Sequence, residues 1–113
     1  MESLPGEAIA GTIRGMKILA LERDVPGVTD GQCAPHLASE ARRAWELQQA
    51  GVIRELWFRA DRDAAVLVLE CAGIEEARGA LETLPLVREG LIDFDVVPLK
   101  AYPGFARLFE AGA

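Results

Sequence analysis

The stretch from Pro35 to Trp57 limits most strongly what this chain can fold into. Residues 35–50 repeat small and apolar side chains at three- and four-residue spacing, which is the pattern of an amphipathic helix. Gly51 follows, and glycine ends helices because it readily adopts the left-handed backbone conformation. An apolar run with aromatic residues then begins at Val52. The sequence therefore predicts a helix, a sharp stop and a strand in direct succession.

The apolar stripe of the predicted helix contains one carboxylate. The stripe consists of Leu37, Glu40, Ala41, Ala44, Leu47 and Gln48. A carboxylate on a core-facing stripe costs free energy to desolvate unless it is paired, hydrogen-bonded or protonated. Glu40 is therefore either satisfied structurally, for example by Arg54 or Arg59, or present for chemistry. A carboxyl group whose pKa is raised by an apolar pocket can accept and return a proton, so Glu40 is our candidate catalytic residue.

The remaining elements follow in an order that is typical of one fold. Strands are predicted over 16–23, 52–60, 64–71 and 91–99, helices over 35–50 and 74–84, and a last helical turn that caps the structure over 105–109. The order βαββαβ is that of the ferredoxin-like α+β fold, an antiparallel sheet with two helices on one face. Because the third strand is apolar on both sides, we expect two copies to stack their bare sheet faces into a dimeric α/β barrel with a central cavity.

The length of 113 residues fits a single domain, which we place at residues 16–113. Prolines and glycines interrupt any period in residues 1–15. This N-terminal arm is either mobile or packed on a neighbouring subunit. Alternatively, the sequence starts too early and Met16 is the true initiator.

Charge and cysteine usage narrow the classes of partner. The formal net charge of −6, without a basic run, argues against nucleic acid, although one arginine in a pocket could still hold an anionic substrate. Cys33 and Cys71 fit no zinc or redox spacing and the chain has one histidine, so we expect no metal and reduced thiols. No segment has the pattern of a membrane span or a signal peptide, so we expect a cytoplasmic protein without a membrane partner.

Three further side chains near Glu40 are candidates for binding a substrate. His36 precedes Glu40 by four residues, so it could hydrogen-bond the carboxylate or a substrate, or simply be exposed. Alternation over residues 52–60 places Phe58 on one side of the strand and Trp57 on the other, together with Ile53. One of the two aromatic rings would face the helices and the other the space between stacked sheets, where it could shape a site for a planar ligand. The alternative is that both rings belong to the core.

The C-terminal third offers weaker candidates. Tyr102 could donate its hydroxyl to a ligand oxygen or cap a backbone carbonyl. Asp93 and Asp95 share one face of the last strand, where Pro98 indicates an edge, and we favour a solvent-facing position over an acidic pair in a cavity. Trp45 lies off the apolar stripe of its helix, which suggests a subunit contact.

A set of motifs over roughly the last two-thirds of the chain matches one known family. The motifs are Glu40, Ala44, Leu47 and Gly51, then Leu56-Trp57-Phe58-Arg59, Leu84-Pro85-Leu86, Ile92-Asp93-Phe94-Asp95-Val96 and Tyr102-Pro103. Together they resemble muconolactone isomerase and its relatives. Members of that family are small dimeric α/β-barrel proteins that need no cofactor and often form decamers. The name-giving enzyme moves a proton within an unsaturated lactone during the breakdown of catechol, an aromatic compound.

The resemblance implies a cofactor-free isomerase that acts on a small unsaturated lactone or acid, as a homodimer or a decamer. Glu40 matches the acidic position of the family's first helix and would be the general acid/base. Tyr102 stands where the family usually has histidine, and the first strand lacks the usual Met-Leu-Phe-like opening. The same architecture hosts other activities. The alternatives are a dimeric-barrel monooxygenase acting on a small aromatic or polyketide-like compound, and a non-catalytic ligand-binding or assembly protein.

Overall fold

The computed structural model describes residues 15–110, so the predicted N-terminal arm lies, apart from Gly15, outside the described residues. The strands of the described part are β1 (Met16–Asp24), β2 (Ile53–Phe58), β3 (Ala65–Cys71) and β4 (Ile92–Pro98). Its α-helices are α2 (Asp30–Cys33), α3 (Leu37–Gln49), α4 (Ile74–Leu81) and α5 (Pro85–Arg88), and its 3₁₀ helices are η1 (Ala34–His36) and η2 (Pro103–Phe109). No helix in this part is long and apolar enough to cross a membrane.

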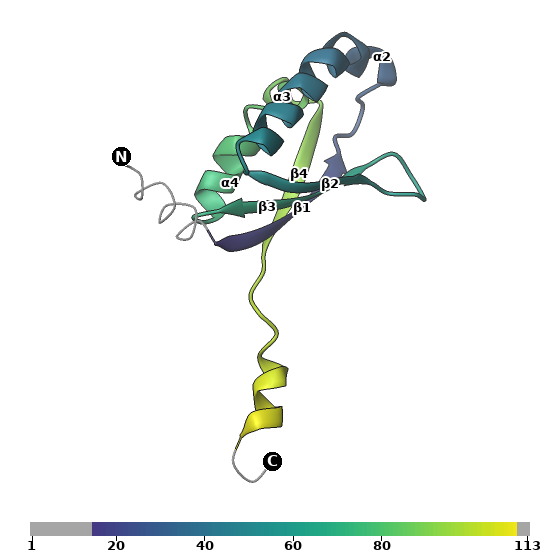
Figure 1. Ribbon diagram of the computed structural model, residues 1–113. Coiled ribbons are helices and arrows are strands. Elements are labelled where there is room, and N and C mark those ends of the chain that lie inside the picture. The colour runs from purple at the N-terminus through teal and green to yellow at the C-terminus, as the bar shows by residue number, and fades with distance from the viewer. Residues whose placement is uncertain (1–14, 111–113) are drawn as a thin grey trace, which may run out of the picture.

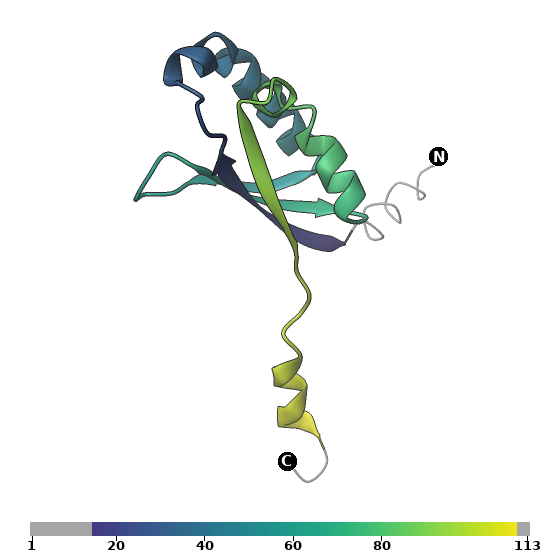
Figure 2. The same cartoon turned by 180° about the vertical axis from the view of Figure 1, so that it is seen from behind.

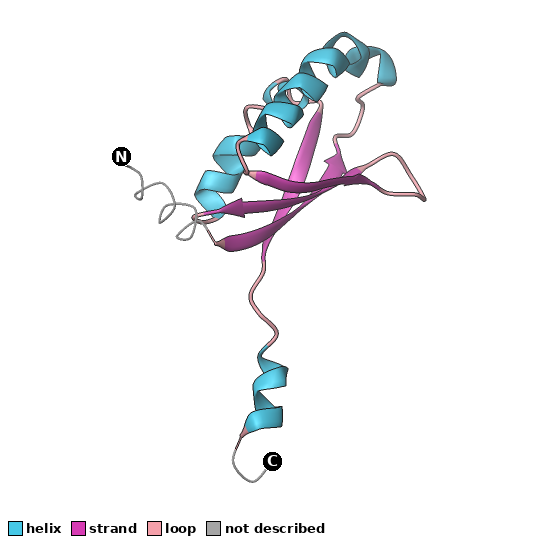
Figure 3. Ribbon diagram, in the orientation of Figure 1, coloured by secondary structure: helices cyan, strands magenta, loops and turns pink. Residues whose placement is uncertain are grey.

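The strands form one antiparallel sheet in the order β2-β3-β1-β4. Helices α3 and α4 lie on one face of this sheet and leave the other face open (Figures 1 and 3). This arrangement confirms the predicted ferredoxin-like α+β fold. Strand β4 is at an edge, as Pro98 indicates, since it pairs with β1 alone among the described strands.

The core fills the space between the helices and the sheet. Along β3, alternate side chains are buried, with Leu69 and Cys71 fully inaccessible, whereas Val66 and Val68 on the open face are half-buried. The helices contribute Leu47, Ala77 and Leu81 to the same core. Because each fully buried leucine stabilises the fold by about 1.5–3 kcal/mol, this layer holds the helices in place over the sheet.

The first helical region begins differently from the prediction of one helix over 35–50. Thr29 and Gln32 form a capping box that starts the short helix α2: the Gln32 N–H donates to Thr29 Oγ1 (3.3 Å) and the Thr29 N–H to Gln32 Oε1 (2.8 Å). Pro35 lies in the 3₁₀ turn η1, and α3 follows from Leu37. The stop is as predicted, because Gly51 has a φ of +82°.

Strand β2 contains an irregularity that corrects the predicted alternation. The pairing with β3 shifts register between Ile53 and Glu55, which is a β-bulge. Ile53 therefore lies on the helix-covered side with Leu56 and Phe58, where all three line the same cavity, and not on the side of Trp57. A bulge depends on how two strands pair, so alternation within one strand does not reveal it.

The last helical turn does not cap the domain. The Leu99 N–H bonds to the Lys17 carbonyl oxygen (2.9 Å), and the chain then leaves the sheet. Figures 1 and 2, which view the molecule from opposite sides, both show η2 standing apart from the sheet and its helices. Its apolar side chains are exposed, with Leu108 72% and Phe109 86% accessible. The sequence prediction that this turn caps the structure is wrong for the single chain.

Candidate functional site: a cavity between helix α3 and the sheet

A cavity of about 400 Å³ lies between α3 and the helix-covered face of the sheet. Helix α3 lines it with Leu37, Glu40, Ala41, Ala44, Trp45 and Gln48, and the facing strands add Leu56, Phe58, Ala65 and Leu67. The dimeric α/β barrel expected from the sequence would place Glu40 at a hollow between two stacked sheets. The structure places this cavity within one chain, because the stripe that carries Glu40 packs toward the sheet of its own subunit.

Glu40 is half-buried in the wall of the cavity. The Leu86 N–H donates to Glu40 Oε1 at 2.8 Å. Leu86 lies in the first turn of α5, where backbone N–H groups lack a partner within the helix. Burial raises the pKa of Glu40 above its ordinary value, although the Leu86 N–H bond opposes the shift; the nearby Glu22 raises this pKa further, while Arg88 and His36 lower it.

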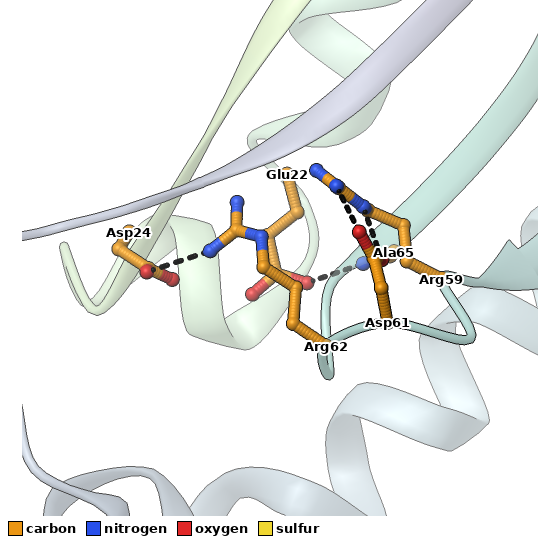
Figure 4. Close-up of polar contacts among 6 residues, drawn as sticks. All are labelled: Glu22, Asp24, Arg59, Asp61, Arg62 and Ala65. Atoms are coloured by element: carbon orange, nitrogen blue, oxygen red, sulfur yellow. Dashed lines mark hydrogen bonds and ion pairs between the residues drawn. The ribbon is translucent and has the colours of Figure 1, made fainter.

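The predicted arginine partners of Glu40 bind elsewhere. Arg54 lies 3.7 Å from Glu70, and Arg59 forms two short bonds to Asp61 (Figure 4). Pairing with either arginine was the structural explanation for Glu40, and that explanation is wrong. The hydrogen bond that satisfies this carboxylate comes from a neutral backbone donor, and Arg88 and His36 act on its negative charge without an ion pair among the described residues.

A second carboxylate, which we missed in the sequence, lines the same cavity. Glu22 extends from β1, and its Oε1 accepts a hydrogen bond from the Ala65 N–H at 2.8 Å (Figure 4). Alternation along β1 puts Glu22 on the same face as the fully buried Ile18 and Ala20. The signal in the sequence is the alternation of Ile18, Ala20 and Glu22 along this strand.

Of the predicted substrate-binding residues, only Phe58 lines the cavity together with Glu40. His36 directly precedes α3 and is outside the cavity wall, although its charge acts on Glu40. Trp57 points to the open face of the sheet, where its Nε1–H donates to Glu55 Oε1 (3.0 Å). Tyr102 lies in the C-terminal segment, its ring 4.9 Å from that of Phe105. Within one chain, Trp57 and Tyr102 are therefore not part of this site.

The acidic residues of β4 are on the open face and pair with β1. Arg23 donates to Asp93 Oδ2 (2.6 Å) and to Asp95 Oδ1 (3.0 Å), and all three side chains are at least half-exposed. This matches the favoured interpretation of a solvent-facing pair. No group of three or more histidine, cysteine or acidic side chains within residues 15–110 is arranged to hold a metal ion.

The part of the chain that forms the cavity also matches a known protein family. Residues 19–104, which include all of α3 and the whole cavity wall, match the family described as Muconolactone delta-isomerase. No curated protein matches the chain. The family match extends over well more than half of the 113 residues and supports an isomerase-like function at the level of the family. The chain therefore belongs to the muconolactone delta-isomerase family.

Proposed function

We propose that this protein is a cofactor-free isomerase that moves a proton within a small unsaturated lactone or acid, with Glu40 as the general acid/base. The observation that carries the proposal is the position of Glu40, a half-buried carboxylate in the wall of a largely apolar cavity of about 400 Å³. A cavity of this size accommodates a small ring compound.

The reaction needs one group that accepts a proton and then returns it. The Glu40 carboxylate removes a proton from a carbon that is activated by the lactone carbonyl, so a C–H bond breaks and an O–H bond forms. The electron pair delocalises over the conjugated system to the carbonyl oxygen. The same proton then returns to the far end of this system, and the double bond shifts without an oxidant, a reductant or a second substrate.

Two features of the site suit Glu40 to this task. The raised pKa of Glu40, caused mainly by burial, makes the protonated carboxyl more stable between the two steps than it would be in water. The Leu86 N–H holds Oε1, so Oε2 is the oxygen that exchanges the proton. The apolar wall opposite Glu40, which includes Leu56 and Phe58, would hold the ring of the substrate against the carboxylate.

The substitution Glu40→Gln tests this proposal. The amide oxygen of glutamine can still accept the Leu86 N–H bond, so we expect the fold to be retained while turnover falls by about 10²–10⁴-fold, the usual contribution of a general acid/base. Proton NMR in D₂O would follow both the double-bond shift and deuterium uptake in unsaturated γ-lactones. The variant Glu75→Gln, on the exposed first turn of α4, is the matched control. Full activity of Glu40→Gln would rule the mechanism out.

The alternative of a non-catalytic ligand-binding or assembly protein predicts a filled cavity and a Glu40 locked by an arginine. Neither feature is found in residues 15–110, since the cavity is open and Arg54 and Arg59 bind other acids. Nothing in the site specifically favours a monooxygenase, and oxygen consumption with electron-rich phenols would be its signature.

We also propose that the protein is a homodimer that pairs the open faces of two sheets. The centre of this face is apolar and includes Leu19, Leu21, Val66 and Val68, which are only half-buried in the single chain. A second copy would remove this surface from water, as expected for a stable symmetric interface.

A further inference from the structure

The hydrogen bond that holds Glu40 joins two segments that are far apart in the sequence. Its acceptor is on α3, and its donor, the Leu86 N–H, is in the first turn of α5 (2.8 Å). Leu84, the N-cap residue of α5, has a side chain that cannot accept a hydrogen bond, and Pro85 has no N–H. The Glu40 carboxylate therefore takes the place of a capping side chain, and its bond depends on how α3 is held against the start of α5.

A second contact bridges the same two segments. Arg43 Nε donates to Thr83 Oγ1 at 2.8 Å, and the Thr83 hydroxyl donates in turn to the Ala80 carbonyl oxygen at 2.6 Å. The same guanidinium bonds Glu46 Oε1 on α3 (3.0 Å). The threonine oxygen is thus tied to α3 on one side and to the end of α4 on the other.

The two contacts are closely spaced along both segments. Arg43 follows Glu40 by three residues on α3, and Thr83 precedes Leu86 by three residues. Helix residues at this spacing lie on the same face. Apolar packing of the segment, in which Leu84 is 2% exposed, is non-directional. The bond between the arginine and the threonine is directional, so it can fix how the two segments are placed against each other.

We propose that Arg43 and Thr83 are positioning residues for Glu40. Their bond holds the start of α5 against α3, so that the Leu86 N–H stays on Oε1 and Oε2 stays free for the proton. Neither positioning residue lines the cavity, so both act through Glu40 and not on the substrate. The inference deepens the proposed function and rests on it for the role of Glu40.

Loosening this contact should change Glu40 in a definite direction. The Leu86 N–H bond lowers the pKa of Glu40 against the larger effect of burial, so a weaker bond lets this pKa rise further. A base must be ionised to accept a proton, so activity should then begin at a higher pH. A change at the threonine leaves in place the other charges that act on this carboxylate, which are Glu22 on β1, Arg88 at the end of α5 and His36 before α3.

The variant Thr83→Val removes the contact without changing the net charge. Valine has nearly the shape of threonine but neither accepts a hydrogen bond from Arg43 nor donates one to Ala80. We expect the pKa of Glu40 to rise by about one pH unit, from the weakening of a hydrogen bond to a charged group. Carboxyl ¹³C NMR of the full-length protein measures this pKa without a substrate, with the Glu40 resonance assigned by its loss in Glu40→Gln.

Turnover of an unsaturated γ-lactone, followed by proton NMR in D₂O, should change in parallel. We expect the acidic limb of the kcat/KM profile of Thr83→Val to move to higher pH. Above this limb kcat should fall by about tenfold, because a displaced base is less well aligned with the proton that it removes. KM should change little, since the threonine is outside the cavity wall.

Two controls separate positioning from a general loss of stability. Thr83→Ser keeps the hydroxyl and should retain the parent pKa of Glu40 and the parent kcat. Thr29→Val removes the threonine hydroxyl that caps α2, a helix that does not line the cavity. It should lower the melting temperature but leave the titration of Glu40 unchanged.

An unmoved titration of Glu40 in Thr83→Val, an unmoved pH profile of its turnover, or an equal shift in either control would overturn the inference. The titration needs no turnover. The proposed isomerase fails on a different result, namely unchanged activity of Glu40→Gln, so the failure of one proposal is distinguishable from the failure of the other.

Discussion

On the helix-covered face of the sheet, Glu22 and Glu40 are bonded to backbone N–H groups beside a hydrocarbon wall, whereas on the open face Asp93 and Asp95 are half-exposed and share Arg23. The same functional group thus has two different environments on opposite faces of one sheet. On the open face, exposed ion pairs contribute only about 0–1 kcal/mol each and serve mainly to keep the edge polar. On the covered face, burial raises the pKa of Glu40, which is the property that chemistry can use.

The contrast between the faces is sharpest in the core strand β3, where Leu69 and Val68 are neighbours that point in opposite directions. Leu69 is fully inaccessible, so Leu69→Ala should lower the free energy of unfolding by about 2–5 kcal/mol. Val68 is half-buried, so Val68→Ala should cost only about 1 kcal/mol. Urea denaturation of both variants at low protein concentration measures the difference. Equal losses would contradict the view that only the covered face is the core.

A charge on the open face should break the proposed dimer without unfolding the subunit. In Val68→Lys the ammonium group can remain in water in a single chain but would be buried between two stacked sheets. We expect light scattering to give half the parent mass, with an unchanged circular dichroism spectrum. Glu75→Lys on α4 is the control and should retain the parent mass. A parent protein that is already monomeric would refute the proposed pairing of sheets.

The smallest effect concerns the pH dependence of stability. Because the pKa of Glu40 is raised in the folded state above the ordinary value of 4.5, the folded chain binds more protons than the unfolded one in the window just above 4.5. Ionisation of Glu40 therefore lowers stability as the pH rises through this window.

Glu40→Gln should remove that penalty, so we expect a variant slightly more stable than the parent at neutral pH and no such advantage below about pH 4. Thermal unfolding at a series of pH values would show it. A variant that is less stable than the parent at neutral pH would mean that the Leu86 N–H bond, and not burial, dominates the energetics of Glu40.

Local patterns were sufficient for the four strands, for the two longer helices and for the main candidate residue. The three- and four-residue spacing from Leu37 to Gln48 predicted a helix with Glu40 on its inner side, and Gly51 predicted the stop. These signals are local because helix period and left-handed glycine depend on adjacent residues. The order of the strands and helices then predicted the ferredoxin-like fold.

The arrangement of the cavity could not be obtained in this way. The bulge that turns Ile53 toward the helices exists only in the pairing of β2 with β3. Glu22 and Glu40 line one cavity because α3 packs over the sheet that contains β1, and Phe58 rather than Trp57 lines it with them because its side chain is on the helix-covered face of β2.

The sequence alone determined the four strands, the two longer helices, their order and the acid on the apolar stripe of the first of these helices, because each depends on residues that are close along the chain. The short helices α2 and α5 were not predicted. Tertiary structure decided that this acid faces the sheet of its own subunit, that Glu22 lies in the same cavity, and that Arg54 pairs with Glu70 instead of Glu40. These are contacts between segments that are distant in sequence, and the free energy of packing and desolvation selects among them only when the whole domain is folded.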